Sequence, residues 1–206
     1  MSQFLQYYKS FQGGKNNNAA PTFEDLSIDD NLSELERTVR YCKSTIALQR
    51  LVHVKLLADV SKTVGVESTC ENILPVLEAI SVDFEPAIRC HLCDQIAMIA
   101  KYCVEDGGDK GYQMVLDAIL PILARLLEDD KVDVRHAASA ALVTVAQYIQ
   151  PPDLGQHILT IILQLAHEDD NEEMRMTASE LLNLLAEHLG FDLCKQFVIP
   201  EVVSLA

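Results

Sequence analysis

Apolar residues recur every three or four positions from about residue 32 to the end of the chain, a period typical of packed helices. The series opens at a capping box, Ser33 followed three residues later by Glu36, which predicts a helix that starts near Leu32 to Glu34. The preceding KSFQGGKNNNAAPT, residues 9–22, has no period and predicts a flexible linker after a short stub, residues 1–8, that contains FLQYY. We therefore expect one all-helical unit over residues 23–206.

A longer period lies on top of the helical one. The stretch 119–150 has a proline, an aspartate eight residues later and an arginine fourteen residues after the proline, and the same marks recur upstream and, one residue later and without the proline, downstream. The three copies carry Pro75, Asp83 and Arg89; Pro121, Asp129 and Arg135; and Thr160, Asp169 and Arg175. Pro200 opens a further copy, and Arg50 belongs to an earlier copy without the proline and the aspartate. The pattern is a repeat unit, because its arginines recur at intervals of 39, 46 and 40 residues.

Each copy predicts a helix with an early proline, a short acidic turn, and a second helix that opens with an apolar-Arg pair. Because an Asp and an Arg occupy equivalent places in successive copies, the Asp of one turn can bond the Arg or the backbone N–H groups of its own or the next copy. The long interval predicts a Gly-rich loop within residues 104–118. Such pairs bury their apolar faces only by stacking, so we expect an α-solenoid of about four repeats plus the start of a fifth. Since the sequence stops within that fifth copy, we expect a fragment of a longer solenoid.

Charge and cysteine usage exclude several classes of function. With 16 basic and 31 acidic residues and a net charge of −15, the chain lacks the basic footprint that nucleic acid requires. No apolar run predicts a signal peptide or a membrane span, and the six cysteines suit reduced, mostly buried thiols, so we expect a cytoplasmic protein with the nucleus as a second compartment. Cys90 and Cys93 lack the second pair that structural zinc needs. No motif for catalysis, metal, cofactor or small-molecule substrate stands out, and we expect no enzyme.

The acidic turns allow two interpretations. One is that their carboxylates cap helices, with no further role. The other is that the stacked turns line up as one acidic ridge for a basic protein partner. The candidate partner-binding residues are Asp83, Glu85, Glu128, Asp129, Asp130, Asp133, Glu168, Asp169, Asp170 and Glu172.

The repeated proline, aspartate and apolar-Arg marks resemble the signature of HEAT repeats. The segments EPAIR (85–89), QIAMIA (95–100) and VRHAASAAL (134–142) are also similar to regulatory and scaffold subunits of type 2A-like Ser/Thr phosphatases, the phosphatase 4 type above all. This resemblance implies a right-handed superhelix and a non-catalytic subunit. It also implies that the turns at 81–86, 128–133 and 167–173 hold a phosphatase catalytic subunit, although Thr160 departs from the pattern.

Two other functions fit an acidic HEAT solenoid. A nuclear transport receptor of the importin-β type would bind basic cargo on the same ridge. A large lipid-kinase-like enzyme would use these helices as an arm and carry its kinase signature elsewhere.

Overall fold

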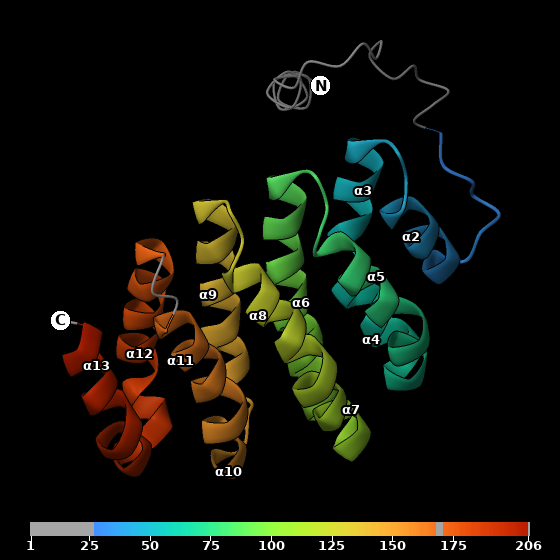
Figure 1. Ribbon diagram of the computed structural model, residues 1–206. Helices are drawn as coiled ribbons and strands as arrows, with labels where there is room; N and C mark the ends of the chain where they lie inside the picture. The colour runs from blue at the N-terminus through green and yellow to red at the C-terminus, as the bar shows by residue number, and fades with distance from the viewer. Residues whose placement is uncertain (1–26, 168–170, 206) are drawn as a thin grey trace.

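The computed structural model describes residues 27–167 and 171–205, and every regular element in those ranges is helical (Figure 1). The stub 1–8, the linker 9–22 and the candidate residues Glu168, Asp169 and Asp170 lie outside them. The elements are α2 Glu34–Cys42, α3 Ala47–Val54, α4 Leu57–Ser68, η2 Thr69–Ile73, α5 Leu74–Ile80, α6 Pro86–Asp106, α7 Gly108–Met114, η3 Val115–Ile119, α8 Leu120–Leu127, α9 Val132–Ala146, α10 Pro151–Asp153, η4 Leu154–Leu159, α11 Thr160–Ala166, α12 Glu172–Leu193, η5 Cys194–Val198 and α13 Ile199–Leu205, where η marks a π-helical turn.

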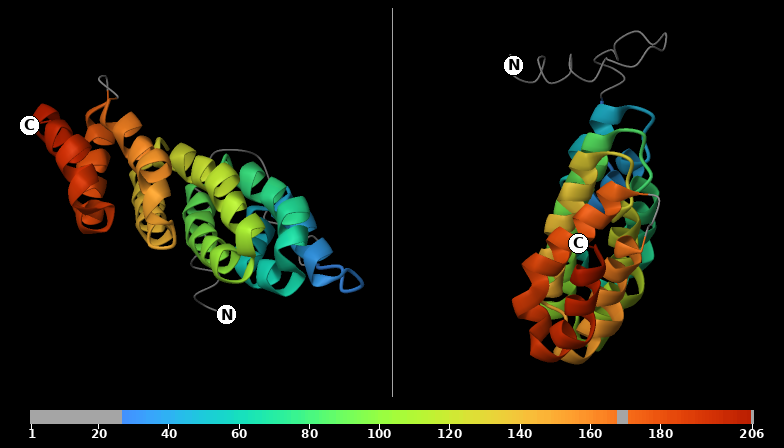
Figure 2. Two further views of the ribbon diagram at one scale, coloured as in Figure 1. Left: turned by 90° about the horizontal axis from the view of Figure 1, so that it is seen from below. Right: turned by 60° about the vertical axis from the view of Figure 1, so that its left-hand side comes forward.

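Successive helices run antiparallel and stack side by side in two layers (Figures 1 and 2). One layer holds α2, α5, α8, α11 and α13, and the other holds α3, α6, α9 and α12. Within the second layer α3 packs on α6, α6 on α9 and α9 on α12. The chain reverses inside the spans of α4 and α12 at Gly65 and Gly190, whose φ angles of 86° and 80° favour glycine. The predicted all-helical solenoid is therefore confirmed.

The core runs through the whole stack without a break. The apolar positions expected behind each arginine are all buried: Ile96, Ile99 and Cys103 on α6, Leu142 and Val145 on α9 with Ile149 just after it, and Leu182, Leu185 and Leu189 on α12. Each helix pair therefore buries its apolar face against its neighbours, as repeat architectures require.

The prolines of the repeat stand where the helix changes register. Pro75, Pro121 and Pro200 are each the second residue of a helix that follows a π-helical turn. A proline ring clashes with the carbonyl of the preceding turn, and a wider π-turn relieves that clash. Thr160, which stands in the proline's place, keeps the π-turn and donates its hydroxyl to the carbonyl of Gly155 at 3.2 Å. The change of register therefore exists in the four copies marked by Pro75, Pro121, Thr160 and Pro200, with or without proline, whereas no π-turn precedes α2 among the described residues.

Two local predictions in the first half of the chain had different outcomes. The capping box is present: the Ser33 side chain accepts from the Glu36 N–H, and α2 begins at Glu34. The predicted loop at 104–118 is wrong, since that segment continues α6 and then forms α7 and η3. Tertiary contacts override its glycines: Met114 is buried, and the Tyr112 hydroxyl donates to Asp153 at 2.6 Å. The extra residues lengthen helices.

Candidate functional site

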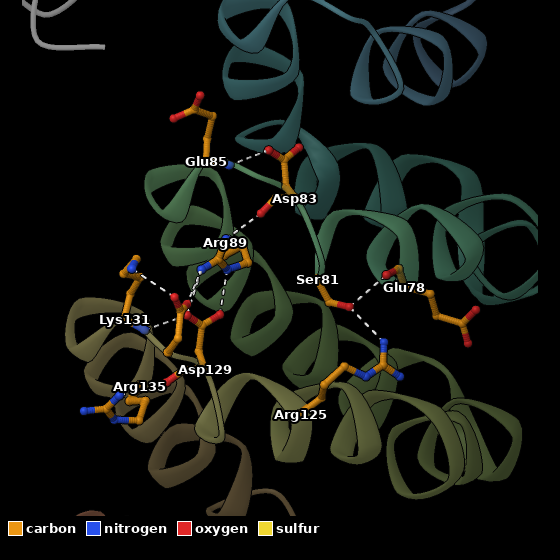
Figure 3. Close-up of polar contacts among 10 residues, drawn as sticks. Glu78, Ser81, Asp83, Glu85, Arg89, Arg125, Asp129, Lys131 and Arg135 are labelled. Atoms are coloured by element: carbon orange, nitrogen blue, oxygen red, sulfur yellow. Dashed lines mark hydrogen bonds and ion pairs between the residues drawn. The ribbon is translucent and has the colours of Figure 1, made fainter. Parts of the chain in front are cut away.

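An arginine at the fourth position of α6 joins two successive turns of the stack (Figure 3). Arg89 donates from Nε and Nη2 to the two carboxylate oxygens of Asp129, at 2.6 and 2.7 Å. Its Nη1 donates to the main-chain carbonyl of Asp83, in its own turn, at 2.5 Å. Paired, parallel N–H···O bonds of this kind are among the strongest side-chain interactions. The hydrogen bonds to Asp129 raise the pKa of Arg89, so the guanidinium stays charged.

The first repeat makes the same contact with a serine in place of its own aspartate. Arg50 binds both oxygens of Asp83, at 2.6 and 2.9 Å, and donates from Nη1 to the carbonyl of Ser44 at 2.9 Å. The Ser44 hydroxyl accepts the N–H of Ile46 at 3.0 Å, which closes the turn. Ser44 lies six residues before Arg50, the same separation as Asp83 from Arg89.

The third repeat continues the series with a change of acid. Arg135 donates from Nη1 to the carbonyl of Asp129 at 2.8 Å, and from Nη2 to the carboxylate of Glu173 on α12. We call Arg50, Arg89 and Arg135, with Asp83, Asp129 and Glu173, the arginine ladder. The repeat predicted a ladder in which an aspartate bonds the arginine of its own or the next copy. The structure has a ladder in these three steps, but each acid binds the arginine of the preceding copy, and the last step uses Glu173 in place of an aspartate.

The ladder aspartates also shape their own turns. Asp83 Oδ1 accepts the backbone N–H of Glu85, and Asp129 Oδ1 accepts that of Lys131, both at 2.9 Å (Figure 3). Each carboxylate therefore closes an Asx turn while it binds the arginine of the preceding repeat. The backbone of each turn is held by its aspartate from one side and by its arginine from the other.

This geometry divides the candidate partner-binding carboxylates into two groups. The side chains of Asp83 and Asp129 are only 6% and 9% exposed, and their oxygens are occupied by the ladder. We correct their assignment: these two residues hold the turns together and offer no carboxylate to a partner.

The remaining described candidates reach the surface, and we call residues 81–86, 128–133 and 171–173 the turn ridge. Glu128, Asp130, Asp133 and Glu172 are exposed, and Glu85 is half-buried. Asp130 receives a hydrogen bond from Lys131, at 2.9 Å, which lowers the pKa of its carboxyl. Lys131 is the one basic residue within the three ranges, so the described ridge is acidic.

Two further features of the ridge were not among the predicted site residues. Phe84 is 96% exposed, and it follows directly after a ladder aspartate. Ser81, at the start of the same turn, is buried, accepts a hydrogen bond from Arg125 of α8 at 3.0 Å and donates to the carbonyl of Glu78 (Figure 3). A phenylalanine between two acids in a turn was a usable signal, whereas the Arg125 contact joins residues far apart in sequence.

The cysteines of α6 lie in the core or pack against it. Cys93 lies in the core, where burial raises the pKa of its thiol to about 12, and Cys90 is half-buried. Within residues 27–167 and 171–205, no three metal-ligating side chains come together. None of the helices in this described part is long and apolar enough to cross a membrane.

Comparison with known proteins agrees with this geometry. The HEAT repeat family model matches residues 119–149, the stretch that contains one full ladder turn. The chain is a HEAT-repeat protein. It is 26% identical over 183 residues to serine/threonine-protein phosphatase 4 regulatory subunit 1 of Rattus norvegicus, and the match covers 87% of this chain. The chain spans only 19% of that relative.

Further likenesses concern a second phosphatase regulatory subunit and the fold. A protein phosphatase PP2A regulatory subunit of Saccharomyces cerevisiae is 28% identical over 103 residues, which is 50% of this chain and 16% of the relative. The crystal structure of Cex1p superposes with a TM-score of 0.60 at 20% identity and covers 78% of this HEAT-repeat chain and 30% of its own. The resemblance to phosphatase regulatory subunits is therefore distant in identity but extends over most of the chain.

Proposed function

We propose that this chain is a non-catalytic scaffold segment of a type 2A-like Ser/Thr phosphatase of the phosphatase 4 kind, and that its turn ridge binds the catalytic subunit. The observation that carries the proposal is the similarity to phosphatase 4 regulatory subunit 1 over 87% of the chain. The ladder supports it, because it occupies the nearly buried carboxylates of Asp83 and Asp129 and leaves most of the exposed carboxylates of the ridge for a partner.

The geometry suits a scaffold in two ways. Since each turn is already fixed by its aspartate and arginine, binding costs little ordering of the backbone. The exposed carboxylates complement a basic partner surface, steer its approach and fix its register. A scaffold that also holds substrate raises the substrate's concentration near a catalytic centre on another chain.

A charge-reversal pair tests the ridge. Asp130→Lys combined with Asp133→Lys changes two exposed residues of the ridge, and because Asp130 also accepts from Arg89 Nη2 at 3.4 Å, the unfolding transition of the variant is compared with that of the unaltered chain. We expect the affinity for a purified type 2A-like catalytic subunit, measured by calorimetry, to fall about tenfold and its dependence on salt to weaken. The matched control is Asp106→Lys with Asp192→Lys, which makes the same charge change at exposed positions outside the ridge, at the last residue of α6 and near the end of α12.

Three results would count against the proposal in different ways. Equal affinity of both double variants would remove the ridge as the binding surface. No binding by the unaltered chain would reject the phosphatase scaffold. Retention of basic localisation peptides in place of the phosphatase would move the assignment to a nuclear transport receptor.

A further inference from the structure

The turn between α5 and α6 presents an aromatic side chain to solvent. Phe84 is 96% exposed, and Val82, on the other side of the ladder residue Asp83, is 66% exposed. A phenylalanine contributes to the stability of its own fold through burial, and Phe84 has almost none. An exposed aromatic on a turn is the kind of residue that dominates the energetics of protein interfaces once it is covered.

The backbone on either side of Phe84 is fixed. The carboxylate of Asp83 binds Arg50 and accepts the Glu85 N–H at 2.9 Å, and the carbonyl of Asp83 accepts from Arg89. Asp83 is thus held to two different helices, α3 and α6, and its carboxylate in turn holds the N–H of Glu85 on the other side of Phe84. The ring is therefore projected from a rigid turn, so a partner that covers it has little backbone freedom to remove.

The charges around the ring define the surface that would receive it. Glu85 follows it directly, and Glu128 and Asp130 stand on the next turn of the ridge. Lys131 is paired with Asp130 and adds little free positive charge. A complementary surface has an apolar pocket for the ring and a border of Lys and Arg side chains.

We infer that Phe84 is the anchor residue of the turn ridge, and that it enters such a basic-rimmed apolar pocket on the catalytic subunit of the phosphatase. This inference rests on the proposed function and adds the residue that contributes most of the affinity. The carboxylates then set orientation and rate of approach, whereas the ring sets the lifetime of the complex.

The test compares two exposed phenylalanines. Phe84→Ala should weaken binding to the purified phosphatase catalytic subunit by about thirtyfold or more, the size expected of a hot spot. Phe191→Ala is the matched control, because Phe191 is 77% exposed near the end of α12, after Gly190 and outside the turn ridge, and it should bind within about twofold of the unaltered chain. The unfolding transitions of both variants should match that of the unaltered chain, since neither ring is buried.

The salt dependence of the affinity distinguishes the contribution of Phe84 from that of the carboxylates. Phe84→Ala should leave the slope of affinity against salt unchanged, whereas Asp130→Lys with Asp133→Lys should reduce it. If Phe84→Ala binds as tightly as Phe191→Ala while the charge variant is weakened, the anchor is wrong and the proposed function stands. If the unaltered chain shows no binding to the phosphatase, both are rejected.

Discussion

Turns 81–86 and 128–133 share one framework and differ at the positions beside it. In both, an aspartate closes an Asx turn, binds the arginine of the preceding repeat and lends its carbonyl to the arginine of its own repeat. The paired residues are Asp83 and Asp129, which are both nearly buried. Packing therefore dictates this position in both turns.

The residues that flank each ladder aspartate follow another rule. Val82 and Phe84 flank it in the first turn, whereas Glu128 and Asp130 flank it in the second, and all four are exposed. Asp130 contacts Lys131 and, at 3.4 Å, Arg89, whereas no ladder bond uses the side chains of Val82, Phe84 and Glu128. Exposed positions of this kind on a turn can vary and specify a partner. The contrast between the nearly buried aspartates and their exposed neighbours distinguishes the ridge residues that stabilise the fold from those that can contact other proteins.

The sharpest way to break the shared framework is to remove the arginine between the two turns. Arg89→Ala leaves Asp129 nearly buried without its cation and Asp83 without a donor to its carbonyl. We expect the free energy of unfolding, measured by urea denaturation, to fall by about 3–5 kcal/mol.

An exposed ion pair is the control for this substitution. Arg40→Ala removes an arginine that is 61% exposed and lies 3.6 Å from Asp29, so its cost should stay below about 1 kcal/mol. Similar losses for Arg40→Ala and Arg89→Ala would mean that the ladder is no stronger than a surface contact.

Smaller effects on the free energy of unfolding distinguish the ladder aspartate from its exposed neighbours within each turn. Asp83→Ala and Asp129→Ala should each cost about 2 kcal/mol, because each leaves a largely buried guanidinium without its charged acceptor. Their exposed neighbours, in Phe84→Ala and Glu128→Ala, should change the free energy of unfolding by less than about 0.5 kcal/mol. A destabilised Phe84→Ala would show that the ring packs on the fold, which would contradict its assignment to a partner.

The repeated part of the fold could be predicted from the sequence because every copy meets the same packing problem. Pro75 and Pro121 and the buried positions behind each arginine all follow from one periodic pattern, whereas the pattern did not show that each acid pairs with the arginine of the preceding copy. The segment 104–118 could not, since its glycines favour a loop and only contacts such as Tyr112 with Asp153 make it helical. Local propensity describes a segment alone, whereas its final state depends on what packs against it.

The sequence predicted where the acidic turns lie, but not which role each carboxylate has. Spacing put the acids of successive turns on one edge, but it did not show which carboxylates point inward. The six-residue separation from Arg50 would have been enough to identify Ser44 as the residue in the aspartate's place. The choice of Glu173 as the acid that binds Arg135 could not be predicted from spacing, because it depends on the three-dimensional path of α12.

The smallest expected effect concerns a surface pair that only the second of the two turns has. The hydrogen bond from Lys131 lowers the pKa of the exposed Asp130 carboxyl from its usual 3.8. Because the folded-state pKa is depressed, the pair stabilises the fold above about pH 3.8, and its contribution is lost as the pH falls through the lowered value. Lys131→Met should move the pKa of Asp130, followed by carboxyl NMR, part of the way back, and roughly 1 M salt should do the same in the unaltered chain. An unchanged titration in both would mean that Lys131 is not bonded to Asp130 in solution, and the second turn would then present a more strongly acidic face beside Phe84.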